Sequence, residues 1–238
     1  MTPETFVEQL RKTLPTGVRS VVLYGSADTG DHLGKQSDYN VLIVLERVGV
    51  VELKALSAPT KAWVKAGNHP PNLFTVEGLK KSGEAFPIEL LDIRDAHRIL
   101  LGDDVLAQID VSAGNLRSQL EHELRGKLIQ LRAQFLLTDL KPKRVVELMT
   151  TTLSKFLILF RAALRLYQKE VPAKKLDALQ ALGQHISFDR EVFVTLHELK
   201  EGRQKPRDAQ AEALFERYLR AVEAVTDVVG EFQKGADR

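Results

Sequence analysis

The stretch Leu23-Tyr24-Gly25-Ser26 decides the fold that we expect, together with Ser37-Asp38-Tyr39-Asn40-Val41-Leu42-Ile43-Val44-Leu45, which follows a polar loop. The apolar run that ends at Tyr24 predicts a strand over 18–24, and the chain then reaches Gly25 and Ser26. The run over 41–45 predicts a second strand. Both faces of this second strand are apolar, so we expect it at the centre of its sheet.

The residues between these strands carry the chemistry. A glycine at a strand end permits a sharp turn and lets a phosphate approach the backbone amides without a Cβ in the way. Ser26 adds a hydroxyl donor. Asp38 and Asn40 are two apart on a strand, so both point to the same face. Two oxygen ligands beside a phosphate-sized gap are suited to hold Mg²⁺ against a nucleotide.

This pattern, Gly-Ser followed after eleven residues by Asp-x-Asn, resembles the signature of the polymerase-beta-type nucleotidyltransferases. The resemblance covers roughly the first half of the chain. It implies that Gly25 and Ser26 hold the phosphates of a nucleoside triphosphate, ATP above all, and that Asp38 and Asn40 hold Mg²⁺. The chain departs from the family in two ways. Asn40 replaces the second acid of the pair, and 27–29 lacks the basic residue that such loops often carry.

A further acid is expected from the run Phe86 to Ile93, which predicts another strand. Charges are rarely buried without a partner or a metal. Glu89 and Asp92 are three apart and would face opposite sides of a strand, so only one of them can face Asp38. The resemblance, in which a later strand adds a third carboxylate, favours Glu89 as a catalytic and metal-binding residue. An ion pair with a nearby Arg or Lys is the alternative.

The number of metal ions follows from the charge of the ligands. Two divalent ions repel each other strongly, and the amide of Asn40 supplies no negative charge to offset that repulsion. With Asp38 and Glu89 as the carboxylates, we expect one Mg²⁺ ion rather than two. A further carboxylate from Asp28 or Asp31 of the loop is the alternative. Lys35, in the loop between the strands, is a candidate to contact a phosphate as a flexible point charge, or else a solvated loop lysine.

The remaining periodicity predicts an α+β chain, with a mixed β-sheet nucleotidyltransferase-like domain over 1–111 followed by an all-α helical bundle over 112–238. A short strand is expected over 72–76, and a connecting region over 95–106. Helices are expected over 3–14, 50–66 with a break or kink at Pro59, 76–81, 115–137, 142–168, 172–183, 187–199 and 208–233.

Composition places the chain among soluble globular proteins, since 44% of its 238 residues are hydrophobic and 28% are charged. It has no Cys, which removes disulfides and thiolate metal sites and is compatible with a cytoplasmic location. No signal peptide is visible. The apolar stretch over 156–166 is interrupted by Arg161 and Arg165 and is too short to span a membrane.

The charge balance differs between the halves. The net charge of +2 does not indicate nucleic-acid binding. Residues 1–111 carry 12 Lys and Arg against 15 Asp and Glu, and residues 112–238 carry 22 against 17, which gives balances of −3 and +5. An acidic half would suit a cation and a basic half an anionic substrate. Solvated helix faces explain the same difference without a ligand.

Three functions are compatible with these residues. The first is an enzyme that transfers a nucleoside monophosphate from Mg-NTP to a hydroxyl acceptor, with a base from the helical half. The second, which Asn40 favours, is a catalytically impaired family member that acts as a nucleotide-binding or protein-interaction module. The third is a ribonuclease-like helical domain that uses Arg190 and His197, seven apart on one helix face.

Overall fold

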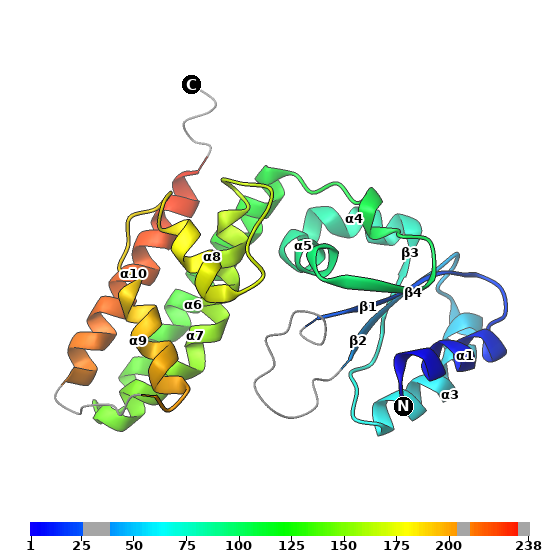
Figure 1. Cartoon of the computed structure of the whole chain (residues 1–238), viewed down its shortest axis with the longest axis horizontal. Coiled ribbons are helices and arrows are strands. Elements are labelled where there is room, and N and C mark those ends of the chain that lie inside the picture. The colour runs from blue at the N-terminus through cyan, green and yellow to red at the C-terminus, as the bar shows by residue number, and fades with distance from the viewer. Residues whose placement is uncertain (26–38, 204–209, 233–238) are drawn as a thin grey trace. The chain divides into compact units, whose positions relative to one another are not determined.

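The computed structural model describes residues 1–25, 39–203 and 210–232 (Figure 1). The chain divides into two compact units, Met1–Ser112 and Ala113–Arg238. The first unit contains the strands β1 (Val18–Tyr24), β2 (Asn40–Leu45), β3 (Asn72–Thr75) and β4 (His97–Gly102). Its helices are α1 (Pro3–Thr13), α3 (Val50–Lys65), α4 (Val76–Ala85), α5 (Pro87–Asp95) and the short 3-10 helix η1 (Leu106–Gln108).

The four strands form one mixed sheet in the order β3-β2-β1-β4. β1 runs antiparallel to both β2 and β4, whereas β2 and β3 are parallel. β2, whose two faces are both apolar, is therefore a central strand, as its sequence predicts, and β1 is the other central strand. The expected fold class is confirmed: a mixed sheet is followed by a helical unit.

Helices cover both faces of the sheet, α1 and α3 on one and α4 and α5 on the other (Figure 1). Alternate residues of the central strands enter different cores because successive strand residues point to opposite faces. Val21 and Ile43 pack with α1 and α3, around Trp63, whose ring stacks on Phe6 at 4.6 Å between centroids. Leu42 and its neighbours pack with α4, α5 and η1.

The predicted bounds of the first two helices are close to those of α1 and α3, but the predicted break at Pro59 is not found. Thr2 caps α1, and its hydroxyl oxygen accepts a hydrogen bond from the Thr5 amide at 3.2 Å. Pro59 does not end α3, which is one continuous helix over Val50–Lys65.

The strand predicted over 86–93 is wrong, because this segment is the helix α5. Pro87 occupies the first turn, where its missing amide hydrogen costs nothing. Ile88 and Leu91, and likewise Leu90 and Ile93, are three apart and buried, a helical spacing that an apolar run conceals. The real strand, β4, follows in the region that we expected to be a connection.

The second unit is entirely helical in the part that the structure describes. Its helices are α6 (Ala113–Leu136), α7 (Pro142–Leu164), α8 (Lys175–Leu182), α9 (Glu191–Lys200) and α10 (Ala211–Glu231). α7 packs against the other four helices and is buried over much of its circumference. Within the described residues, no helix has the length and apolarity that a membrane crossing requires.

Candidate functional site

A row of polar side chains crosses the sheet at the end where β1 finishes and where β2, β3 and β4 begin. We call it the edge row: Asn72, Asn40, Tyr24 and His97. Tyr24 at the end of β1 pairs with Asn40 on one side and with His97 on the other. Each residue is an even number of positions from a strand neighbour that packs toward α4 and α5, so the row shares that face of the sheet.

Hydrogen bonds fix the position of the edge row. The Asn72 side-chain nitrogen donates to the Tyr24 hydroxyl oxygen at 2.7 Å, which links the outer strand β3 to β1 across β2. The His97 Nδ1–H donates to the backbone carbonyl oxygen of Arg94, at 2.8 Å. The His97 Nε2 lies 3.4 Å from a carboxylate oxygen of Asp104.

The Tyr24 phenol is a neutral group at physiological pH. Burial raises its pKa above the ordinary value, and the hydrogen bond from Asn72 only partly opposes that shift. Since the oxygen accepts from Asn72, the hydroxyl proton points elsewhere and is suited to donate to an anionic ligand. The edge row therefore presents hydrogen-bond donors.

Gly25, directly after β1, has a backbone that only glycine adopts easily. Its φ is +103°, and a Cβ built on it would lie 2.8 Å from the Asn40 side-chain nitrogen. Both the dihedral angle and the lack of space exclude a larger residue there. The result is a left-handed backbone turn with the Asn40 side-chain amide packed directly against it.

The structure brings Gly25 and Asn40 together, and Ser26, Lys35 and Asp38 lie outside the described residues. At the start of β2, the Tyr39 amide donates to the Asn68 side-chain oxygen at 3.3 Å. This bond ties the point where the chain re-enters the sheet to the turn after α3. The two ends of the loop that carries the predicted site are thus both held by the sheet.

Glu89 lies exposed on α5 and not on a strand. On a helix, Glu89 and Asp92 are three apart and share a face, whereas a strand would have separated them. Both are engaged in interactions within the chain. α5 packs through Leu90 and Ile93 on the same sheet face as the edge row. A role for Glu89 in the site stays a prediction.

The described residues hold no cluster of three or more His, Cys, Asp or Glu side chains arranged for a metal ion. The donor that the structure places at the edge is the Asn40 side-chain amide. Its oxygen is a hard ligand of the kind that Mg²⁺ prefers, but it is neutral. Binding of one Mg²⁺ ion by Asn40 together with Asp38 stays a prediction, because Asp38 lies outside the described residues.

Three residues of the edge row were missed by sequence reasoning. Tyr24 and Asn72 are the last and first residues of their strands, and polar residues at strand ends that meet one edge are a usable signal. Finding Asn72 also requires the parallel pairing of β2 with β3. His97 was hidden because β4 itself was not predicted.

Arg190 and His197 lie at the start and within α9, as the ribonuclease-like alternative requires. However, the Arg190 side chain packs over Gly183, and its guanidinium donates to the Gln180 side-chain oxygen at 3.1 Å. These contacts give Arg190 a structural role between α8 and α9, and nothing further supports this alternative.

Comparisons with known proteins complete the description. No protein-family model matches the chain, and no curated protein sequence matches it. Among solved structures, the chain is similar to the spectinomycin adenyltransferase AAD(9) from Enterococcus faecialis, crystallised with ATP and spectinomycin. The identity is 13%, the match covers 91% of this chain and 97% of that one, and the TM-score is 0.45.

A second similar structure is a toxin-antitoxin crystallised with AMP-PNP, with 13% identity, coverage of 43% of this chain and 76% of that one, and a TM-score of 0.30. Because both TM-scores are below 0.5, we take the evidence for function from the residues of this chain alone.

Proposed function

We propose that the edge row and the loop between β1 and β2 bind a nucleoside triphosphate and transfer its nucleoside monophosphate to a hydroxyl acceptor. One observation carries the proposal: the turn at Gly25, with φ +103°, lies against Asn40 where no Cβ fits. The sequence pattern of nucleotide-binding type is therefore supported by a turn that only glycine adopts easily and that contacts Asn40, one of the predicted Mg²⁺ ligands.

Each residue has a distinct part in this proposal. The Gly25 backbone and Ser26 bind the β- and γ-phosphates, of ATP in the first instance, and Lys35 adds a positive charge. Asp38 and Asn40 would hold one Mg²⁺ ion, which supplies neutralisation of the phosphate charge when bound. The neutral Tyr24 hydroxyl donates to the same anion. Glu89, on the helix α5 that covers the sheet face of the edge row, is the second carboxylate after Asp38.

The absence of cysteine fits a reducing compartment such as the cytosol, where nucleoside triphosphates and Mg²⁺ are present. We therefore propose a cytoplasmic location. The acceptor would be a hydroxyl compound, activated by a general base.

A second candidate function is nucleotide binding without transfer. Two observations favour it: Asn40 brings no charge to the edge, and Glu89 is exposed on a helix where the family resemblance leads us to expect a strand carboxylate. Such a protein would respond to nucleotide and pass the response to a partner. The two candidates share the binding step and differ in whether pyrophosphate is released.

The test is calorimetric titration of ATP and GTP into the protein, with Mg²⁺ and with a chelator. We expect binding only with Mg²⁺, and loss of binding in Asp38→Ala. Glu8→Ala is the control, because it removes one negative charge from the exposed surface of α1, which packs on the other face of the sheet from the edge row. Equal effects of both variants, or no binding under any condition, would refute the site.

A pyrophosphate-release assay with a panel of hydroxyl compounds then separates the two candidates. Release that depends on both the acceptor and Asp38 establishes transfer. Binding without release for every class of acceptor supports the impaired module.

A further inference from the structure

The Asn40 carboxamide is a polar group that the fold itself does not use. Asn40 is half-buried at the first position of β2, and its side chain makes no hydrogen bond within the part of the chain that the structure describes. The other two asparagines of the first unit are engaged, since the Asn68 side chain makes two hydrogen bonds and that of Asn72 makes one. A partly buried amide without a protein partner is suited to a ligand.

The carboxamide turns its nitrogen toward the backbone turn that follows β1. Of the atoms around a Cβ built on Gly25, the three nearest are Asn40 Nδ2 at 2.8 Å, Cγ at 3.7 Å and Cβ at 3.9 Å. The side-chain oxygen is not among them, so the planar amide directs it away from Gly25. Asn40 therefore presents N–H donors to the turn, whereas the acid that the family resemblance leads us to expect would present only acceptors.

A second neutral donor lies beside Asn40. Tyr24 pairs with Asn40 between β1 and β2, so the two side chains share one face of the sheet. The Tyr24 hydroxyl oxygen accepts from Asn72 at 2.7 Å, and burial raises the pKa of Tyr24, which keeps the hydroxyl protonated. Two uncharged donors on neighbouring strands are suited to bind the oxygen atoms of an anion.

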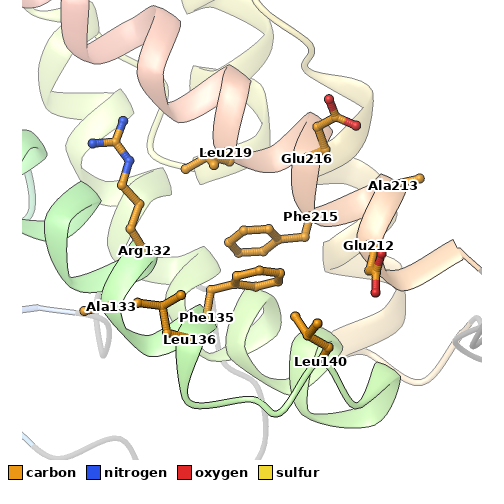
Figure 2. A pocket seen from close by; sticks show the side chains of 10 residues that line it. All are labelled: Arg132, Ala133, Phe135, Leu136, Leu140, Glu212, Ala213, Phe215, Glu216 and Leu219. Atoms are coloured by element: carbon orange, nitrogen blue, oxygen red, sulfur yellow. The ribbon is translucent and has the colours of Figure 1, made fainter.

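An open groove in the second unit does not offer such donors. It lies between α6 and α10 and has a volume of about 890 Å³. Figure 2 shows the rings of Phe135 and Phe215 at its centre, stacked with their centroids 4.1 Å apart. Its cation, Arg132, is already engaged in an ion pair, and the carboxylates of Glu212 and Glu216 also line it. This lining disfavours a phosphate, which supports the edge row as the phosphate site.

We propose that Asn40 binds the nucleotide directly, by donating a hydrogen bond from Nδ2 to a phosphate oxygen beside the Gly25 turn. This inference rests on the proposed function, in which the Gly25 backbone binds the phosphates, and it gives Asn40 a role beyond holding Mg²⁺ through its oxygen. The asparagine in place of the expected acid then supplies a hydrogen-bond donor to the phosphate. A carboxylate at the same position would repel that phosphate.

The substitution Asn40→Asp separates the two roles of the side chain. It keeps oxygen ligands for a cation, removes both N–H groups and hardly changes the volume of the side chain. If Asn40 acted only as a metal ligand, the added negative charge would strengthen the binding of Mg-ATP. If Asn40 donates to a phosphate, we expect Asn40→Asp to lower the affinity for Mg-ATP roughly tenfold or more, as measured by calorimetric titration at saturating Mg²⁺.

Inorganic tripolyphosphate with Mg²⁺ is the second probe, because it carries the phosphates without a base or a ribose. Asn40→Asp should weaken the binding of tripolyphosphate by the same factor as the binding of Mg-ATP. A loss that is confined to Mg-ATP would show that Asn40 contacts the nucleoside, and it would contradict the proposal.

Two control variants accompany Asn40→Asp. Gln9→Glu makes the same change from amide to carboxylate on α1, which packs on the other face of the sheet, and it should leave both affinities unchanged. Asn40→Ala removes the nitrogen and the oxygen without adding a charge, so it should lower both affinities by a smaller factor than Asn40→Asp. Circular dichroism of each variant establishes that the fold is intact.

The outcomes distinguish this inference from the proposed function. If the folded Asn40→Asp variant binds Mg-ATP as tightly as the unmodified chain, or more tightly, the phosphate contact is refuted and nucleotide binding stands. If the unmodified chain binds neither Mg-ATP nor tripolyphosphate, the proposed function is refuted, and the phosphate contact with it.

Discussion

At the scale of single residues, the Asn40 side chain lies in the volume that a side chain at position 25 would need, at the end of β1. Because Gly25 has no Cβ, the Asn40 amide can occupy this space without a clash. Gly25 also adopts a positive φ without the strain that a residue with a Cβ would have. These two effects contribute separately to stability, so suitable variants can separate them.

We predict that Gly25→Ala lowers the free energy of unfolding by about 1–3 kcal/mol, because it combines left-handed backbone strain with the contact to Asn40. Gly67→Ala is the control: its φ is +94°, but nothing lies within 4 Å of a Cβ built there. Urea unfolding should show a larger loss for Gly25→Ala, and adding Asn40→Ala should remove the excess. Equal losses at positions 25 and 67 would show that the contact with Asn40 relaxes freely.

Tyr218 is a buried residue whose ionisation should be visible in alkaline unfolding. Its hydroxyl and that of Thr152 are 3.2 Å apart, and burial raises the pKa of Tyr218 far above its ordinary value of about 10. Below that pH both the folded and the unfolded states keep the proton. Above it only the unfolded state releases the proton, so stability falls as pH rises.

We predict that Tyr218→Phe reduces this fall by up to about 1.4 kcal/mol per pH unit above pH 10. At neutral pH the variant should lose only about 1 kcal/mol, because Thr152 keeps its bond to the Leu148 carbonyl at 2.8 Å. Urea unfolding at several pH values measures both effects. Thr152→Val is the control that removes the partner but keeps the ionisable group, and it should retain the alkaline slope.

At the scale of whole elements, the predictions that succeeded rest on local signals. Thr2 and the following proline mark the start of α1, and apolar runs mark β1 and β2. The approach of Gly25 to Asn40 comes from the antiparallel pairing of β1 with β2, which the structure adds to these local signals.

The predictions that failed depend on tertiary contacts. α5 is buried on several sides, so its sequence reads as a continuous apolar run rather than a helix. β4 has polar His97 and Arg98 at its start and only a short apolar core, because it is an edge strand. To predict the edge row from the sequence, one must know that β4 is a strand and that β3 pairs in parallel with β2. Neither fact can be inferred from local periodicity.

A further element-scale prediction concerns the link between α9 and α10. Asp189 accepts hydrogen bonds from Arg217 at 2.7 and 3.2 Å, and one of its oxygens also accepts from the Val192 amide at the start of α9. The hydrogen bond from Arg217 lowers the pKa of Asp189 below its ordinary value. The ion pair therefore stabilises the fold above the unfolded-state pKa and is lost as pH falls through and below it.

We predict that Asp189→Asn lowers stability at pH 7 by less than about 1 kcal/mol, since both partners are partly exposed to solvent. The difference from the unmodified protein should shrink as pH falls below about 4, where the unfolded state begins to bind the proton, and should vanish only below the lowered pKa of Asp189 in the folded state. Denaturation from pH 3 to 7 checks this. Glu216→Gln, which breaks an exposed pair with Arg220 four residues away, should change stability by no more than about 0.5 kcal/mol. The ion-pair explanation would be contradicted if the difference in the free energy of unfolding between Asp189→Asn and the unmodified protein grew as pH falls.

At the scale of the whole molecule, the two compact units provide separate reporters of unfolding. The chain has one tryptophan, Trp63, which is fully buried in the first unit against Phe6. Its fluorescence therefore follows the unfolding of the sheet unit. The long helices α6, α7 and α10 all belong to the second unit, so far-ultraviolet circular dichroism is dominated by that unit.

We predict that Mg-ATP raises the unfolding temperature reported by Trp63 and leaves the helical transition almost unchanged, because the proposed site lies in the first unit. Ligand at 100 times its dissociation constant stabilises the binding state by about 2.7 kcal/mol, which is enough to shift a transition by several degrees. ATP with a chelator, and Mg-ATP with Asp38→Ala, should leave the Trp63 transition in place. If nucleotide moves both transitions together, either the two units unfold as one or residues of the helical unit also contribute to the binding free energy, and the prediction of a separate response is wrong.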